Sequence, residues 1–220
     1  SDVYKRQMQR NWLNVPHVTQ FDDADITEMD SFRKSLKAEG EMRGVRVTPV
    51  AFLVKAIATA LEDNAGFNRS LAGDGESYIQ KQYCNIGMAV DTPRGLVVPV
   101  IRNASSMGIW EIAGEVAQLA EKAREGKLKP SDMQGGCFTL SSLGAIGGNG
   151  FTPIVNAPEL GILGVSKAQM KPVWNGHDFV PRLMLPLALS YDHRLINGGD
   201  AGRFMTQIVK LLSDIRHLAL

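Results

Sequence analysis

The sequence predicts one α+β domain. Leucines alternate strictly with other residues from Arg182 to Ser190, which is the strongest strand signal in the chain. Other segments repeat apolar residues with the helical period. These helices interleave with strands irregularly, unlike the even alternation of a parallel doubly wound sheet. The 220 residues, 44% of them hydrophobic, suit one large domain or two small ones. No internal repeat or low-complexity linker divides them, so one domain is the simplest organisation.

A strand and two helices are expected in the N-terminal part of the chain. The strand covers Val15–Phe21, and the first helix begins near Asp25, whose carboxylate can serve as the N-cap. The second helix begins at Thr48, with Pro49 as its first residue, where a missing N–H costs nothing. Apolar residues recur at helical spacing: Ile26, Met29, Phe32 and Leu36 in the first helix, then Val50, Leu53, Val54, Ile57 and Leu61 in the second. The second helix is apolar on most sides, so we expect it to be buried.

The middle of the chain carries a strand–turn–strand pattern and a third helix. Tyr83–Val90 and Leu96–Ile101 are predicted as strands around the turn Asp91–Gly95, which contains proline and glycine. The helix covers about Gly108–Arg124 and is followed by Gly126, a typical helix terminator. Its apolar residues share one face: Ile109, Ile112, Ala113, Val116, Leu119, Ala120 and Ala123.

The last third of the chain is mostly strand until a final helix. Short strands at Cys137–Ser142 and Gly161–Val165 flank the glycine-rich loop Gly144–Gly150. The alternating strand Arg182–Ser190 follows, and the final helix covers about Asp200–Leu218. Its apolar residues face one way: Ala201, Phe204, Met205, Ile208, Leu211, Leu212 and Ile215.

The composition argues against a nucleic-acid-binding protein and against a membrane protein. The formal net charge is only +1, whereas a nucleic-acid binder usually carries a basic stripe. No segment approaches the roughly 18 uninterrupted apolar residues of a membrane helix, and no signal peptide is visible. We therefore expect a soluble, intracellular protein. The two cysteines, Cys84 and Cys137, stand in apolar runs and are expected to be buried and reduced.

The first seven residues, SDVYKRQ, fit none of these patterns. We interpret residues 1–7 as a non-native or disordered leader. The predicted domain is therefore 8–220.

The sharpest local feature is Ser190–Gly199, SYDHRLINGG, between the best strand and the last helix. A loop at a strand end can hold a reactive group rigidly and leave it accessible. His193 stands between Asp192 and Arg194, and an imidazole can take a proton from a thiol or hydroxyl near neutral pH. From the residues alone, His193 is equally well a general base or a surface histidine in a charged turn. Asn197 is equally well an orienting group or a turn residue.

The other histidines give weaker signals. His17 follows Pro16, His177 follows the hairpin signal Asn-Gly, and His217 lies near the end of the last helix. No pair has metal-ligand spacing, so we expect no metal site.

Ser141 and Ser142 end a predicted strand and precede the glycine-rich loop. A serine there can donate a hydrogen bond to an oxyanion or attack as a nucleophile, although serines are also common in turns. The loop Gly144–Gly150 lacks the Gly-Lys-Ser/Thr ending of a phosphate-binding loop, and Pro153 stands where a dinucleotide fingerprint needs glycine. Both nucleotide interpretations are therefore rejected.

The segment Asp192–Gly198, DHRLING, resembles the DHRxxDG-type signature shared by chloramphenicol acetyltransferases and dihydrolipoamide acyltransferases. Further segments match in order: Arg10–Phe21, Gly87–Arg102, Phe138–Leu143 and Phe151–Lys167. The last of these is especially similar to the acetyltransferases of pyruvate dehydrogenase complexes. The resemblance covers about residues 8–220, and several segments in order are far more specific than one short motif.

The resemblance implies a chloramphenicol acetyltransferase-like fold, a two-layer arrangement of a mixed sheet and packed helices. It also implies a homotrimer with active sites in channels between subunits, and trimers that build a cubic or icosahedral core. In the family, lipoyl and subunit-binding domains precede this core, so the chain is expected to be part of a longer protein.

The resemblance also implies roles for individual residues. His193 matches the general base that deprotonates the attacking thiol, and Ser141 matches the serine that donates a hydrogen bond to the tetrahedral oxyanion. Asn197 stands where many members carry Asp, which puts a salt bridge at that position in doubt but keeps a hydrogen bond possible. Asp91 is expected to line the substrate channel.

The implied reaction moves an acetyl group between dihydrolipoamide and coenzyme A in a 2-oxo-acid dehydrogenase complex, with the pyruvate complex as the best match. The substrates are coenzyme A or acetyl-coenzyme A and a lipoyl group on a separate domain. The implied partners are lipoyl domains, the decarboxylase and the dihydrolipoamide dehydrogenase, with no nucleic acid and no membrane. The expected location is the bacterial cytoplasm, or the mitochondrial matrix in a eukaryote.

Several other functions remain as alternatives. A succinyl- or branched-chain acyltransferase of a sister complex and a non-catalytic core protein share the fold. A free-standing antibiotic acetyltransferase shares the histidine, but the 154–167 run favours the complex-forming branch. A serine hydrolase using Ser141 and His193 would need a Gly-x-Ser-x-Gly elbow, which is absent from the sequence.

Overall fold

The computed structural model describes residues 2–144 and 146–218. Within these residues the central element is a mixed sheet of seven strands in the order β1, β11, β9, β8, β4, β7, with β10 paired to β11. β8 is parallel to β4 and β9, and the other pairs are antiparallel. The strands are β1 (His17–Asp25), β4 (Ile86–Met88), β7 (Val100–Ile101), β8 (Phe138–Ser142), β9 (Gly161–Val165), β10 (Gln169–Trp174) and β11 (Phe179–Asp192).

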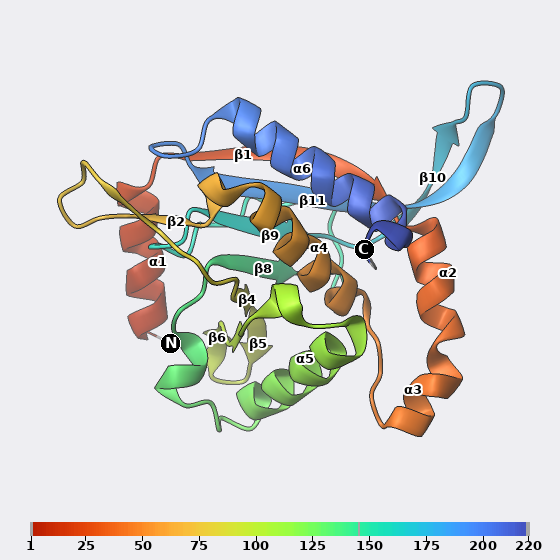
Figure 1. Ribbon diagram of the computed structural model, residues 1–220, viewed down its shortest axis with the longest axis horizontal. Helices are drawn as coiled ribbons and strands as arrows, with labels where there is room; N and C mark the ends of the chain where they lie inside the picture. Colours follow the sequence, from red (N-terminus) through yellow and green to blue (C-terminus); the bar gives the residue numbers. More distant parts are fainter. Residues whose placement is uncertain (1, 145, 219–220) are drawn as a thin grey trace.

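Helices form a second layer (Figure 1). α4 (Pro49–Asp63) and α6 (Gly198–Ser213) lie over the sheet, and α5 (Ile109–Arg124) packs against α4. α2 (Thr27–Ser35) and α3 (Lys37–Arg43) extend at one side, and α1 (Asp2–Asn14) lies at the other. The predicted two-layer α+β arrangement is confirmed.

The core lies between α4, α6 and the sheet. α4 begins at Pro49, as predicted, and is buried on most of its sides. Phe67, Phe138 and Phe204 pack together with ring centroids 4.3 to 6.3 Å apart. Since Phe138 belongs to β8 and Phe204 to α6, this aromatic cluster joins the two layers.

Smaller elements connect the main ones. Two short hairpins, β2 (Arg69–Leu71) with β3 (Tyr78–Gln80) and β5 (Val90–Thr92) with β6 (Gly95–Val97), are separate from the large sheet. Single 3-10 turns are η1 (Ala65–Phe67), η2 (Ala104–Ser106), η3 (Pro130–Met133) and η4 (Ile215–Leu218).

Two predicted boundaries near the first strand are wrong. β1 pairs with β11 along its whole length, so Asp25 is its last residue and does not cap the next helix. α2 begins at Thr27, although the Asp25 carboxylate still accepts a hydrogen bond from the Thr27 N–H at 3.0 Å. The expected single helix through Leu36 is two helices, because Leu36 lies between α2 and α3.

Two predicted strands are also interrupted. Leu96–Ile101 divides into β6 and β7, because Pro99 has no N–H to donate to a ladder. Of Tyr83–Val90, only β4 joins the large sheet, and Val90 begins β5.

The final helix is shorter than the predicted Asp200–Leu218 at its C-terminal end. α6 begins at Gly198 and ends at Ser213, because Asp214 is extended, with φ −138° and ψ 95°. Ile215–Leu218 then forms the separate turn η4.

Helix α1 includes most of the segment interpreted as a leader. Residues 2–7 are helical, and residue 1 lies outside the described residues. The C-terminal half of α1 contacts the domain, since the buried Asn11 amide donates to the Val155 carbonyl at 3.1 Å. The non-native origin of residues 1–7 stays a prediction.

Both cysteines are buried and free, as predicted. Burial raises the pKa of the Cys84 thiol to about 12 and also raises the pKa of Cys137. Among residues 2–144 and 146–218, no helix is long and apolar enough to cross a membrane.

Candidate active site

Ser141 and His193 lie at opposite ends of the strands that form the sheet, and these two ends are called its edges below. In the ladder, Ser141 is opposite Gly164 of β9, and Gly164 is opposite Ala188 of β11. His193 comes five residues after Ala188, just beyond the end of β11. At about 3.3 Å per residue, the two side chains are separated by roughly 16 Å along the strand direction. Within one chain they cannot contact the same reacting group.

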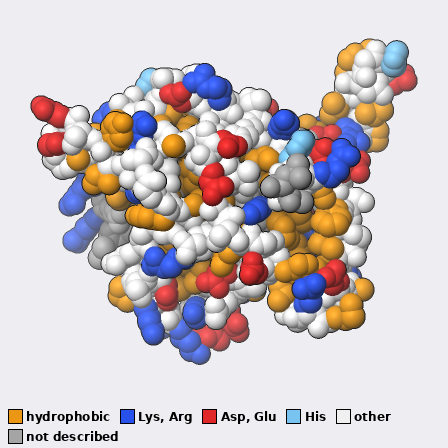
Figure 2. Space-filling view, viewed as in Figure 1, with side chains coloured by type: hydrophobic (Ala, Val, Ile, Leu, Met, Phe, Trp, Pro, Cys, Tyr) orange, Lys and Arg blue, Asp and Glu red, His pale blue; other side chains and the backbone are white. Residues whose placement is uncertain are grey.

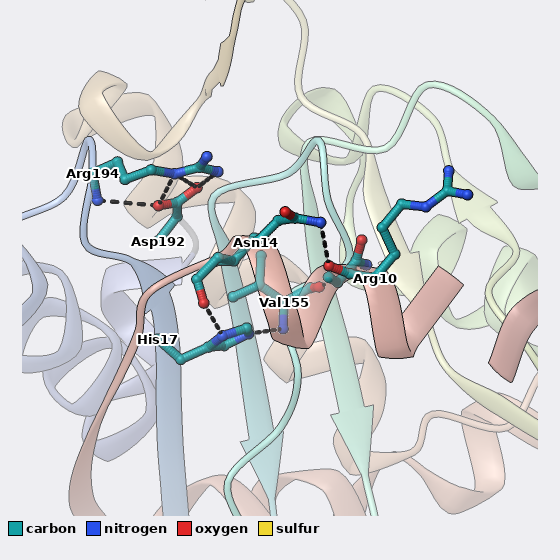
Figure 3. Close-up of polar contacts among 8 residues, drawn as sticks. Arg10, Asn14, His17, Val155, Asp192 and Arg194 are labelled. Atoms are coloured by element: carbon teal, nitrogen blue, oxygen red, sulfur yellow. Dashed lines mark hydrogen bonds and ion pairs between the residues drawn. The ribbon is translucent and has the colours of Figure 1, made fainter. Parts of the chain in front are cut away.

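The turn that carries His193 is fixed by an ion pair between its neighbours (Figure 3). The Asp192 carboxylate is almost fully buried and accepts from the Arg194 guanidinium at 2.6 and 2.9 Å and from the Arg194 backbone N–H at 3.0 Å. The Asp192 backbone carbonyl accepts from the N–H of Ile196 at 3.0 Å. These contacts hold a tight turn in which the His193 side chain is exposed.

The N-terminal segment also holds this turn. The His193 backbone N–H donates to the Pro16 carbonyl at 3.0 Å. His17, the next residue, is paired with Asp192 at the start of β1. The start of β1 and the end of β11 therefore form one rigid edge around His193.

Asn197 lies at the same edge, where it caps α6. Its side-chain oxygen accepts a hydrogen bond from the Asp200 N–H at 3.0 Å. His193 and Asn197 are four residues apart, and both lie between the end of β11 and the start of α6.

Asp91 lies at the edge that carries Ser141. The Ala89 N–H donates to the Leu140 carbonyl at 2.9 Å, so the β5–β6 hairpin starts beside Ser141. Asp91 is exposed in that hairpin, opposite Leu96. Of the four predicted site residues, Ser141 and Asp91 share one edge, and His193 and Asn197 share the other.

One buried acid was not found from the sequence. Burial raises the pKa of Glu159 from an ordinary 4.5 to about 7. Its carboxylate accepts a hydrogen bond from the Thr139 hydroxyl at 2.5 Å, and the Asn156 amide lies 3.4 Å away. A glutamate in the loop segment Ala157-Pro158-Glu159 gives no periodic signal that would place it inside the protein.

Among residues 2–144 and 146–218, no group of three or more His, Cys, Asp or Glu could hold a metal ion. The expectation that the protein has no metal site stays a prediction. His177 lies in the exposed turn between β10 and β11. His217 lies 3.8 Å from the Asp214 carboxylate.

A family model described as "2-oxoacid dehydrogenases acyltransferase (catalytic domain)" matches residues 2–220. The chain belongs to this family. Among curated members, the dihydrolipoyllysine-residue acetyltransferase component of the pyruvate dehydrogenase complex of Pseudomonas aeruginosa is 58% identical over 213 residues. The alignment covers 97% of this chain and 39% of that relative. The chain thus spans well under half the length of this relative of the acyltransferase family.

Solved structures of family members have the same fold. Two of them superpose with a TM-score of 0.98 at 56% identity, covering 100% of this chain and 90% of theirs. One is Azotobacter vinelandii dihydrolipoamide acetyltransferase, and the other is the cubic core of the pyruvate dehydrogenase multienzyme complex. Chloramphenicol acetyltransferase, at 15% identity and a TM-score of 0.62, shares the fold with this acyltransferase domain, covering 94% of each chain.

Proposed function

We propose that this chain is the catalytic core of an acetyltransferase that moves an acetyl group between dihydrolipoamide and coenzyme A in a pyruvate dehydrogenase complex. Membership of the acyltransferase family and the names of relatives up to 58% identical support this assignment. Those names favour acetyl over the succinyl and branched-chain alternatives.

The proposed reaction is a direct transfer between two thiols. His193 takes the proton of the attacking thiol, and the resulting thiolate adds to the thioester carbonyl. The tetrahedral oxyanion accepts a hydrogen bond from the Ser141 hydroxyl, a contact that typically stabilises a transition state by about 2.7–4 kcal/mol. The intermediate then collapses, the second thiolate leaves, and the imidazolium of His193 returns the proton to it.

The separation of His193 and Ser141 is the observation that carries this proposal furthest. Both groups must lie within hydrogen-bond reach of one reacting centre, at about 3 Å. Since they stand at opposite edges of one chain, the site needs His193 from one subunit and Ser141 from a neighbour. In a homotrimer with three such interfaces, every subunit pairs its His193 with Ser141 of one neighbour and its Ser141 with His193 of the other.

An exposed hairpin supports this assembly. β10 and the start of β11 project from the body at the edge that carries Ser141, with hydrophobic side chains on their surface (Figures 1 and 2). Met170, Trp174 and Phe179 are 64%, 56% and 70% exposed. Large apolar side chains on a projecting arm are typical of a surface that is covered by another subunit.

The solved structure of the A. vinelandii acetyltransferase comes from an investigation of the role of a serine, a histidine and an asparagine in the catalytic mechanism of that enzyme. These three residues stand at the same separations along their chain as Ser141, His193 and Asn197 do here. The match supports the proposed roles of all three, with Asn197 orienting a neighbouring group through its amide.

We propose that the trimers build a larger core, since one of the solved structures of matching fold is a cubic core. The lipoyl domains that present dihydrolipoamide, the decarboxylase and the dihydrolipoamide dehydrogenase would be its partners. A cytoplasmic location fits this role in a bacterium.

Initial rates with acetyl-, succinyl- and branched acyl-coenzyme A, each with dihydrolipoamide, test the proposal. Acetyl-coenzyme A should give the highest kcat/KM. A preference for succinyl or branched acyl groups would assign the chain to a sister complex. If trimers were present but transferred none of the three acyl groups, the chain would be a non-catalytic core protein.

A further inference from the structure

His17 makes two hydrogen bonds that fix its protonation state (Figure 3). Its Nδ1 lies 2.8 Å from the Val15 carbonyl, and its Nε2 accepts a hydrogen bond from the Val155 N–H at 2.9 Å. A carbonyl can only accept and a backbone N–H can only donate, so Nδ1 carries the proton and Nε2 carries the lone pair. His17 is therefore a neutral imidazole in one tautomer.

Through this ring, the segment before β1 is joined to the loop before β9. Val155 is fully buried, and its two backbone groups are both bound by the N-terminal segment: the N–H by His17 and the carbonyl by Asn11. Val15 and Val155 also pack together with Ile162 in a small apolar cluster. His17 supplies the acceptor that a buried N–H requires.

The same segment holds the backbone of His193. Pro16 lies between Val15 and His17, and its carbonyl accepts from the His193 N–H at 3.0 Å. This hydrogen bond joins main-chain atoms of both residues, so it holds the backbone of His193. The position of the backbone from which the His193 imidazole projects therefore depends on the position of Pro16.

We propose that His17 is a positioning residue for His193. By joining Val15 to Val155, the neutral His17 ring fixes the Pro16 carbonyl and thus the backbone from which the His193 side chain projects. This role rests on the proposed function, because it concerns the base of the acetyl transfer. A misplacement of about 1 Å at a reacting group can cost a large factor in rate.

Three substitutions at His17 separate the two ring contacts. In His17→Gln, the side-chain oxygen takes the place of Nε2 and accepts from Val155. In His17→Asn, the side-chain amide takes the place of Nδ1, and the Val155 N–H loses its acceptor. His17→Phe loses both contacts. We expect His17→Asn and His17→Phe to lower kcat about tenfold with both KM values within about twofold, and His17→Gln to keep most of the parent kcat.

Thr19→Val is the matched control for lost stability. It removes a hydrogen bond between the hydroxyls of Thr19 and Ser190, 2.7 Å apart, from the same pair of strands but leaves Pro16 and Val155 untouched. We expect this variant to unfold at a lower temperature and to keep the parent kcat. A loss of kcat equal to that of His17→Asn would overturn the proposal, because general loosening of β1 would then explain both results.

The His193→Ala background gives the decisive comparison. If His17 acts through His193, adding His17→Asn to His193→Ala leaves the residual rate unchanged. A further loss overturns the proposal, as does equal kcat in the Gln and Asn variants when both are folded trimers. An inactive parent chain would instead refute the acetyltransferase function, and this role with it.

Discussion

At His193, the ion pair between the two flanking residues and the hydrogen bond to Pro16 hold the main chain and leave the imidazole exposed. A side chain held in this way can be removed without opening the core. We expect His193→Ala to lower kcat about 10²–10⁴-fold, because the proposed general base is lost. The free energy of unfolding and the proposed trimer should stay as in the parent.

Rates with acetyl-coenzyme A and dihydrolipoamide, together with light scattering, measure both quantities. His217→Ala, in the η4 turn after α6, is the matched control and should keep full activity. If His193→Ala retained activity within a factor of two of the parent, another group would have to be the base.

The buried carboxyl group of Glu159 predicts that the free energy of unfolding depends on pH. Burial raises its pKa to about 7, so between about pH 5 and pH 7 the folded protein holds a proton that the unfolded chain has released. Its stabilising contribution is complete below the unfolded pKa and is lost as pH rises through the folded pKa, by up to about 3 kcal/mol. Glu159→Gln stays neutral and should remove this loss.

The urea midpoint at fixed protein concentration, measured from pH 5 to pH 8, checks the prediction. Glu159→Gln should gain stability relative to the parent as pH rises, whereas Glu41→Gln, at an exposed position, should follow the parent at every pH. A parent and a Glu159→Gln variant with parallel profiles would mean that Glu159 does not titrate in this range.

At the scale of elements, the role of Asn197 as the N-cap of α6 can be tested separately from its proposed role in the site. Asn197→Ala removes the acceptor for the Asp200 N–H and should lower the free energy of unfolding by about 1 kcal/mol. Asn197→Asp keeps an acceptor at the same position and should match the stability of the parent. Urea unfolding of the three proteins measures this, and equal stability of the alanine variant would show that the cap does not stabilise α6.

The elements that could be predicted from the sequence are those with a strong local pattern. The leucines of β11 alternate over enough residues to define a strand, and Pro49 marks the start of α4. β10 was missed because Pro172 interrupts it and its six residues are stabilised by pairing with β11, which no local pattern reveals. The break at Pro99 was visible in the sequence and shows that a proline inside an apparent strand has to be given more weight.

At the scale of the whole molecule, the opposite placement of His193 and Ser141 predicts complementation between inactive chains. Trimers assembled at random from His193→Ala and Ser141→Ala subunits should regain part of the parent activity. Where a Ser141→Ala subunit supplies His193 to a neighbour that supplies Ser141, both intact groups meet at one interface.

Rates measured on trimers that mass spectrometry has shown to be mixed test this prediction. Each variant reassembled with itself is the control and should stay inactive. No recovery in mixed trimers would mean that both groups act within one chain, against the sheet register.

The candidate site itself could be named from the sequence but not assembled from it. The DHRLING segment and the serine after Leu140 are local signals, and both are found at strand ends, as expected. Their placement at opposite edges depends on β8 being parallel to β9 while β11 is antiparallel to it. That order arises from pairing between residues far apart in the chain, for which one sequence carries no signal. Glu159 and His17 were missed for the same reason, since each depends on a distant partner.

The two buried thiols have a consequence for the proposed acetyl transfer. An acyl group passes to any thiolate that can approach it, and a cysteine that captured one would form a dead-end thioester with the protein. With the pKa of Cys84 at about 12 and that of Cys137 also raised, both sulfurs stay protonated and inaccessible. In the proposed reaction, the domain should therefore resist self-acylation, and the acyl group should pass only between the two substrates.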